Sequence, residues 1–502
     1  MGRVATSAVL LTLSLFAAGG CGGGGGGGGI ASGPSDWAAP FVPASGAASY
    51  FIGLRNLDDS STTVNVTGYR PDGTAYALPL AVTIDGAGEE ILTLSDAIGG
   101  FAAAGGVVYV ATPSRHVDVY FDVEVPAIDA ADASRAFALP DLAAPPPGPF
   151  RTGVNATTLT TAIQLGNASG AVAAVSVTAY EESLSDPLAP PVATTVVLAP
   201  FAAGESRVYT PDALSGIPNF TGSFLIESPA PLFAAAQEST QSLAFDVPRV
   251  ATKTRNVAVA LLYGRDNLTV APTFLDFALV ARNDDDSPRT LTITRMSRED
   301  GFALYSGVRS ITLEAHESRV VTTMDPPFDD VFGDVLLSST FQRIALEMSV
   351  PSGVDVGLRE FEPQTLVALT SFTPCPFGHV VIVSDVFPSA TLPSAVRTYA
   401  SVVNPSNASI TVTYEALVPQ PSGYDAAPQP ISTLTIPAHG RVDVSPDGLV
   451  FVDRDLVAVD YVGLRFRSSA PVCVTAWRAT RSGSNAVETL VSLPVRSLDD
   501  GE

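Results

Sequence analysis

Short stretches of alternating apolar and polar residues recur along most of the chain. In one of them Val64 and Val66 flank Asn65, and Thr67 follows. A period of two places apolar side chains on one face and polar side chains on the other, which is typical of a strand with one buried face. Residues between the stretches are mostly Gly, Pro, Asp, Asn and Ser, which end strands and form turns. No segment beyond Gly29 sustains a helical period over three turns behind a capping residue, so the pattern predicts an all-β protein.

One block of sequence recurs in four places along the chain. Each copy is an apolar stretch that ends in asparagine, then a short polar turn, then alternating apolar residues. Recurrence of this kind indicates a repeated structural unit. The copies are YFIGLRNLDDSSTTVNVTGY, TAIQLGNASGAVAAVSVTAY, FALVARNDDDSPRTLTITRM and TYASVVNPSNASITVTYEAL, with asparagines at Asn56, Asn167, Asn283 and Asn404.

Two further blocks follow each asparagine block in the same order. The second reads DGAGEEILTL, FAAGESRVYT, EAHESRVVTT and PAHGRVDVSP, and in it Glu90, Arg207, Arg319 and Arg441 each precede Ile or Val. The third reads SPAPLFAAAQ and SSAPVCVTAW, with TPSRHVDVYF and STFQRIALEM as weaker partners. Three blocks in one order predict four copies of a single β unit.

The length of the unit indicates its architecture. About 110 residues of short strands and turns suit an antiparallel β-sandwich. The pattern resembles the immunoglobulin-like or fibronectin-type-III-like repeats of bacterial surface lipoproteins. We therefore predict four tandem antiparallel β-sandwich domains, whose immunoglobulin-like character is implied by the resemblance. We call them repeats one to four, with predicted bounds at 39–145, 148–250, 255–368 and 374–498.

The N-terminal residues have the features of an export signal. Arg3 precedes the mostly apolar run Val9 to Ala18, which is too short for a permanent membrane span and is typical of a signal peptide. The sequence AGGC, with Cys21 directly after small residues, resembles the lipobox of bacterial lipoproteins. The resemblance implies removal of residues 1–20 and lipidation of Cys21. Ordinary secretion with a free Cys21 is the alternative.

The residues after Cys21 predict a flexible tether over 21–38. Eight consecutive glycines follow the cysteine, and polyglycine behaves as a flexible coil. Gly22 stands where aspartate would resemble an inner-membrane retention signal, so we expect the outer membrane or cell surface rather than the inner membrane.

Charge restricts the partners. Asp and Glu number 51 against 27 Lys and Arg, for a formal net charge of −24. A strongly acidic chain repels polyanions, so nucleic acid is excluded as a partner. The expected partners are a membrane, through the N-terminal lipid, and an unidentified extracellular or envelope protein or glycan.

Candidate chemistry is sparse. His116, His316, His379 and His439 form no pair with metal-ligand spacing, and the usual serine hydrolase and zinc protease motifs are absent from the sequence. The sequence predicts no catalytic residue and no cofactor. Cys375 and Cys473 remain once Cys21 is assigned to lipid, and an even remainder in an oxidising compartment predicts a structural disulfide between them.

Two weaker candidates concern ligands. Asp284, Asp285 and Asp286 form an acidic turn that could bind calcium, although solvated turn residues are the favoured interpretation because Asp is common in turns for its own hydrogen bonding. A carbohydrate-binding face would need displayed aromatic side chains, for which the candidates are Tyr109, Tyr120, Phe121 and Trp477. The overall expectation is a non-enzymatic surface scaffold or adhesion and binding module. A carbohydrate-binding protein and, less favoured, an unrecognised extracytoplasmic hydrolase are the alternatives.

Overall fold

A computed structural model gives the fold of this chain. It describes the following residues: 35–41, 49–76, 79–86, 88–100, 105–113, 116–125, 133–138, 150–156, 160–167, 171–181, 191–230, 232–240, 242–246, 253–265, 274–304, 307–323, 325, 327–328, 342–362, 367–372, 375–386, 396–417, 429–444, 462–481, 487–492 and 495–497. The described residues are almost entirely strands, and every strand pair is antiparallel, so the prediction of an antiparallel all-β protein is confirmed.

Repeat one forms two sheets, with the orders β1-β6-β3-β4 and β5-β2-β7-β8. In every repeat we call the sheet that holds the first strand the first sheet, and the other the second sheet. The strands of repeat one are β1 (Ser35–Phe41), β2 (Ser49–Asn56), β3 (Thr62–Tyr69), β4 (Leu80–Ile84), β5 (Glu89–Thr93), β6 (Gly106–Thr112), β7 (Val117–Val125) and β8 (Ala133–Ala138).

Repeat two has the same two strand orders. Its first sheet is β9-β14-β11-β12 and its second sheet is β13-β10-β15-β16. Its strands are β9 (Phe150–Ala156), β10 (Thr160–Asn167), β11 (Ser176–Glu181), β12 (Val192–Val197), β13 (Ser206–Tyr209), β14 (Gly222–Ser228), β15 (Leu232–Thr240) and β16 (Ser242–Asp246).

Repeat three keeps both orders within a larger sheet. β17-β22-β19-β20 and β21-β18-β23-β24 are joined where β17 pairs with β18, and the short strand β25 (Cys375–Pro376) pairs with β17. The strands are β17 (Arg255–Arg265), β18 (Phe274–Asn283), β19 (Arg289–Arg298), β20 (Arg309–Leu313), β21 (Ser318–Thr322), β22 (Gln342–Val350), β23 (Val354–Glu362) and β24 (Val367–Phe372).

Repeat four differs because one strand serves both sheets. In the first sheet, β29-β28-β31-β26, β31 stands where the other repeats have their sixth strand. In the second sheet, β30-β27-β31-β32, it stands where the other repeats have their seventh strand. The strands are β26 (Gly378–Val386), β27 (Val396–Val403), β28 (Ile410–Leu417), β29 (Gln429–Ile436), β30 (Arg441–Val444), β31 (Val462–Arg481), β32 (Val487–Ser492) and β33 (Val495–Ser497), which pairs with β26.

The recurring order shares part of the immunoglobulin arrangement. The second strand pairs with the fifth and the third with the sixth, as in an immunoglobulin constant-type sandwich. The first strand, however, pairs with the sixth and the seventh with the second. In immunoglobulin domains the first strand joins the second and the seventh joins the sixth, so these two strands have exchanged sheets.

Within the described part of the chain, two helices of four and five residues interrupt the strands. They are α1 (Leu94–Ala97) and α3 (Pro211–Ser215). The latter begins behind Thr210, whose hydroxyl accepts a hydrogen bond from Ala213 N, and ends at Gly216 in the left-handed conformation. Neither helix is long and apolar enough to cross a membrane.

Each repeat has its own hydrophobic core between its two sheets. In repeat one the alternating residues Val64 and Val66 of β3 pack with Ile52 and Leu54 of β2, as the period of two predicts. The other repeats have equivalent clusters. The cluster of repeat four also takes in Ala258, Ala260 and Ala345 from repeat three, so the apolar packing crosses that boundary.

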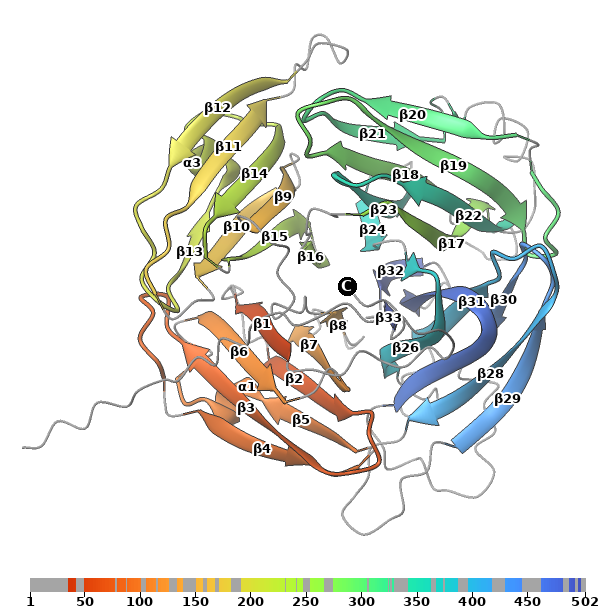
Figure 1. Cartoon of the computed structure of the whole chain (residues 1–502), viewed down its shortest axis with the longest axis horizontal. Helices are drawn as coiled ribbons and strands as arrows, with labels where there is room; N and C mark the ends of the chain where they lie inside the picture. Colours follow the sequence, from red (N-terminus) through yellow and green to blue (C-terminus); the bar gives the residue numbers. More distant parts are fainter. Residues whose placement is uncertain are drawn as a thin grey trace, which may run out of the picture.

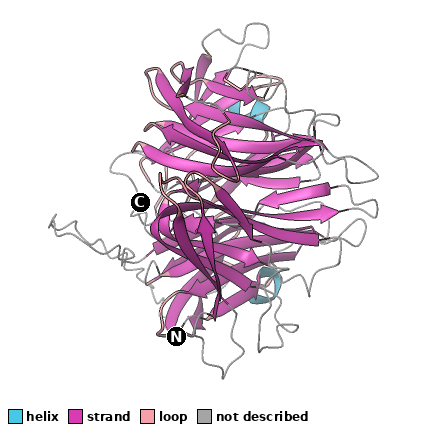
Figure 2. Cartoon of the chain, turned by 90° about the vertical axis from the view of Figure 1, so that its right-hand side faces the viewer, coloured by secondary structure: helices cyan, strands magenta, loops and turns pink. Residues whose placement is uncertain are grey.

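The repeats stand in a ring around a common centre (Figure 1). The outermost strands of the first sheets, β4, β12, β20 and β29, lie at the rim, while β8, β16, β24 and β32 lie near the middle. β32 contacts both β24 and β8, so the last repeat meets the first. Figure 2 shows the same sheets from the side.

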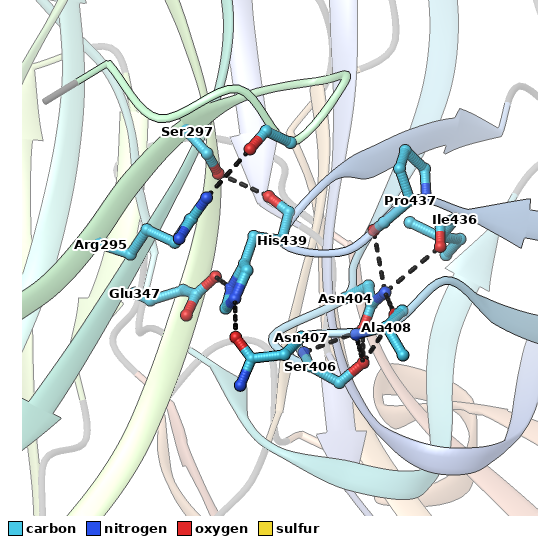
Figure 3. A network of polar contacts seen from close by, with 11 residues as sticks. Arg295, Ser297, Glu347, Asn404, Ser406, Asn407, Ala408, Ile436, Pro437 and His439 are labelled. Atoms are coloured by element: carbon cyan, nitrogen blue, oxygen red, sulfur yellow. Dashed lines mark hydrogen bonds and ion pairs between the residues drawn. The ribbon is translucent and has the colours of Figure 1, made fainter. Parts of the chain in front are cut away.

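The recurrent asparagine fixes two loops of its repeat. The Nδ2 of Asn404 donates to the carbonyl oxygens of Ala408, Ile436 and Pro437 at 2.8, 3.2 and 2.8 Å, and its Oδ1 accepts from Ser406 N (Figure 3). Asn56, Asn167 and Asn283 are equally buried and make the same three carbonyl contacts. A buried amide that satisfies several backbone groups explains why the apolar stretch ends in asparagine each time.

A tight turn precedes the fifth strand of each repeat. In repeat four Gly440 N donates to Pro437 O, and His439 holds a φ of 54°. His316 holds 61° and Gly204 holds 72° at the corresponding places. A positive φ at the third residue is characteristic of a type II turn. The histidines at two of these positions, His316 and His439, are thus residues of a repeated turn.

Strand register corrects the alignment of the second block. The backbone N of each recurrent asparagine bonds to the carbonyl oxygen of the last turn residue, which is Glu205 in repeat two and Gly440 in repeat four. Arg441 therefore corresponds to Ser206, not to Arg207, and likewise not to Arg319 or Glu90. The sequence alignment was wrong by one residue because it matched arginines rather than turns.

Other predicted boundaries also move. β1 begins at Ser35, so its first residues fall inside the predicted tether of 21–38. β24 continues to Phe372, beyond the predicted end of repeat three at residue 368. The segment STFQRIALEM was wrongly matched to the third block, since it leads into β22, a sixth strand; the seventh strand of repeat three begins at Val354.

Candidate functional site: the junctions between repeats

Several buried polar groups lie where one repeat meets the next. At each junction the first sheet of one repeat faces the second sheet of the following repeat. Gln164 of β10 donates to Gly106 O of β6, for example, and Ala260 N of β17 donates to Thr475 Oγ1 of β31. The contacts are head-to-tail, a heterologous arrangement that yields a closed ring when the rotations sum to a full turn.

The junction between repeats one and two rests on neutral groups. The hairpin loop after β3 places Pro71 O against Ser206 N at 3.0 Å, in line with an isolated bridge between Asp72 and Glu205. Tyr109 donates from its hydroxyl to Asn167 O at 3.0 Å. Burial raises the pKa of Tyr109 above its ordinary value of 10.0, so this hydroxyl stays protonated at neutral pH.

The junction between repeats three and four has the same backbone frame. Its loop, Arg298 to Gly301, matches Arg70 to Gly73 in hydrogen bonding and in the positive φ of its glycine. Glu299 O accepts from Arg441 N at 3.0 Å, as Pro71 O does from Ser206 N. The two loops thus add their backbone to the fifth strand of the next repeat in the same way.

Arg441 fills this second junction with a buried charge. Its Nη1 donates to Leu261 O at 2.7 Å and to Ile344 O at 3.0 Å, both in repeat three. Its Nη2 donates to Ser401 Oγ at 2.9 Å and to Asp443 Oδ1 at 2.8 Å. The side chain is fully buried, so the guanidinium exchanges water for four protein acceptors, the condition under which a buried charge is tolerated.

His439 reaches across the same junction. Its Nδ1 lies 3.0 Å from Glu347 Oε1 in repeat three, and its Nε2 lies 2.8 Å from Asn407 Oδ1 in its own repeat (Figure 3). Its carbonyl oxygen accepts from Ser297 Oγ at 2.5 Å. Burial raises the pKa of Glu347, and the hydrogen bond from His439 and the charge of Arg295 oppose this rise.

The two remaining junctions use other side chains. Between repeats two and three the rings of Tyr180 and His316 stack with centroids 4.2 Å apart. Between repeats four and one the Arg55 guanidinium packs against Gly463, where any side chain would overlap it. Arg55 is buried and bonds to Glu89 Oε1 at 2.8 Å. Each junction thus has its own side-chain chemistry.

The acidic turn of repeat three does not converge on one point. Its three carboxylates pair with three different cationic or imidazole groups, and the described residues contain no group of three His, Cys, Asp or Glu side chains placed to hold a metal ion. Asp284, Asp285 and Asp286 pair with Arg282, Arg289 and His316 respectively. Their partners favour the structural interpretation of this turn.

The predicted cysteine sites are only partly visible. Cys21 lies outside the described residues, and its lipidation stays a prediction. Cys473 is buried in β31 with its Sγ 3.0 Å from Ala258 O, and the backbone of Cys375 pairs with the same residue, Ala258. The register therefore brings both cysteines to one point of β17. The side chain of Cys375 lies outside the described set, so the disulfide also stays a prediction.

The aromatic candidates for carbohydrate binding are not displayed. Tyr120, Phe121 and Trp477 are buried, and Tyr109 is used in the junction between repeats one and two. Tyr120 donates to Glu89 Oε1 at 2.8 Å. Strand aromatics here serve packing, and these four residues do not form a sugar-stacking face.

Sequence reasoning missed most junction residues. Arg441 was visible only as a member of a repeat, and Glu347 had no distinguishing neighbour. The one usable signal was the Gly or His that stands shortly before the fifth strand and marks the turn.

No family model matches this chain, and no curated protein or solved structure matches it either.

Proposed function

We propose that this chain is a non-enzymatic scaffold or binding module of the cell envelope, built from four tandem immunoglobulin-like β-sandwich domains and held by a lipid on Cys21. The polyglycine tether would let the ring stand off the membrane surface. Its loops would then face potential partners, as loops on a rigid scaffold commonly do.

One observation carries the proposal. Arg441, His439 and Glu347, which are polar or ionisable and could take part in chemistry, instead make hydrogen bonds across the junction between repeats three and four. Groups used in this way hold repeats together and are not free for a substrate. A rigid ring of repeats supports presentation, and the signal-like N-terminus supports export of that ring.

Protease shaving of intact cells tests the proposal. Wild-type protein should be cleaved from outside, and the Cys21→Ser variant should be released into the medium. Protection of the wild type until the outer membrane is opened would overturn surface display. Retention of Cys21→Ser on the membrane would overturn the lipid anchor. A protein with the same tether fused to a neutral reporter controls for general leakage.

A further inference from the structure

One rim strand differs from its three counterparts. β12 forms the end of the sheet β12-β11-β14-β9 and pairs with β11, and no second neighbour occurs among the described strands. β4, β20 and β29 each send at least one residue into a core, such as Ile84, Ile311 and Ile436. No residue of β12 is buried, and Val192 and Val197 are 64% and 76% exposed.

The edge of β12 is also unguarded. Proteins commonly protect sheet edges with charged residues, proline or a bulge. β20 begins with Arg309, and β29 contains Pro430 and an irregular register. β12 reads VATTVV, and its pairing with β11 continues without a register shift. It therefore presents a regular, uncharged, β-branched edge whose alternate N–H and C=O groups point away from β11.

We propose that β12 is a homotypic docking edge, at which β12 of a second copy adds antiparallel to form a continuous sheet across a two-fold axis. The proposal goes beyond the proposed envelope function and does not depend on it. A two-fold pair of this kind is the commonest arrangement of identical chains.

The sequence of β12 suits a second copy. In an antiparallel pair related by a two-fold axis perpendicular to the sheet, opposing residues share a face, so one residue must oppose its own copy. The longest overlap places Thr194 or Thr195 at that centre. The first register sets Val192 opposite Val196, and the second sets Val196 opposite Thr194 and Val197 opposite Ala193. Such β-branched and threonine pairs stabilise cross-strand contacts.

The net charge of the chain predicts a salt dependence for this association. The chain carries a formal net charge of −24, so two copies repel over long range. β12 itself has no charged residue, and neither does the rim strand β4, which reads LAVTI; β12 differs from β4 in that none of its residues is buried. Two copies therefore approach at β12 without direct like-charge contact. Added salt screens the remaining repulsion, and association should strengthen as salt rises.

Sedimentation velocity tests the proposal on the full chain, purified in a non-ionic detergent. We expect a reversible monomer–dimer equilibrium that shifts toward dimer with protein concentration and with salt. The double variant Val192→Asp/Val197→Asp should associate about tenfold more weakly or worse. Val308→Asp is the matched control, since Val308 is 69% exposed in repeat three, and it should behave as wild type.

Cysteine cross-linking tests the register in the folded protein. Either Thr194→Cys or Thr195→Cys should give a disulfide-linked dimer under mild oxidation, and Val308→Cys should not. A wild-type chain that stays monomeric at every concentration and salt would overturn the proposal. So would unchanged association of the double aspartate variant, or failure of both β12 cysteines to cross-link above the Val308→Cys level.

Discussion

The junction between repeats one and two and the junction between repeats three and four share a backbone and differ in chemistry. In both, a hairpin loop bonds to the fifth strand of the next repeat, through Pro71 O in one and Glu299 O in the other. The first junction is completed by neutral groups, the second by a buried arginine, a carboxylate and a histidine. The comparison teaches that backbone geometry sets the frame of a repeat contact, while side chains set how each contact responds to mutation and pH.

The largest expected effect is at Arg441. Arg441→Met should lower the free energy of unfolding by about 3–5 kcal/mol, because it leaves buried acceptors without their donor. Ser206→Ala, at the equivalent place, should cost less than about 1 kcal/mol, since the junction uses the backbone N–H of Ser206.

Urea unfolding in a Trp37→Phe background measures both variants. Trp477 is then the sole tryptophan, and it lies in repeat four with the Arg441 guanidinium 6.0 Å from its ring centre. Equal losses in the two variants would contradict the contrast between the junctions.

The next largest loss of stability should be similar in the two junctions, because it comes from the glycine of each hairpin loop. Gly73→Ala and Gly301→Ala each place a methyl group onto a backbone oxygen of the next repeat, at Ala203 and Ala438, in a residue of positive φ. We expect each to cost about 2–4 kcal/mol in the free energy of unfolding. Thermal unfolding followed by circular dichroism would measure these losses.

Gly216→Ala is a control that separates backbone strain from steric overlap of the added methyl group. Gly216 has a positive φ of 72° but no atom within 4 Å of an added Cβ, so only the conformational cost should appear. If Gly73→Ala or Gly301→Ala cost no more than this control, the loops would not be held tightly against the next repeat.

The third prediction concerns pH at the charged junction. Burial raises the pKa of Glu347 above its ordinary value of 4.5, so the folded state binds this proton more tightly than the unfolded state. This contribution favours folding at low pH and is lost as pH rises from about 4.5 through the raised pKa. Glu347→Gln should remove that part of the pH dependence, each unit of pKa shift being worth about 1.4 kcal/mol.

Stability measured by urea unfolding across this pH range would check the sign. The slope of free energy against pH should become more positive in Glu347→Gln than in wild type. An unchanged slope would mean that Glu347 does not titrate differently on folding.

The smallest effect should be at the neutral junction. Tyr109→Phe removes one hydrogen bond, to Asn167 O, and should cost about 1 kcal/mol. Because burial raises the pKa of Tyr109, the loss should be the same at pH 5 and pH 8. A pH-dependent loss, measured by the same urea titration, would remove the distinction between the two junctions.

The sequence predicts the local structure better than the contacts between repeats. The alternation around Val64 and Val66 predicts β3, and the recurrent asparagines predict the repeat, because strand period and turn chemistry are local properties. The acceptors of Asn404 Nδ2 include carbonyls about thirty residues away, so the role of the asparagine was not readable from its neighbours.

The junction residues were hidden for a different reason. Arg441 bonds to Leu261 and Ile344 of another repeat, and nothing in its local sequence records which surface it meets. The exchange of the first and seventh strands between sheets was equally unreadable, because a strand pattern shows which face is buried but not which sheet receives it.

Closure of the ring changes what the loss of one junction means. When the contact of Arg55 with Gly463 opens, repeats one and four remain linked through the other three junctions. Reclosing is then an intramolecular event, governed by the effective concentration of one face near the other rather than by the concentration of the protein. A weak junction in this molecule therefore opens and recloses rapidly. Its loss should expose the two facing surfaces of that junction to solvent, while all four repeats stay together.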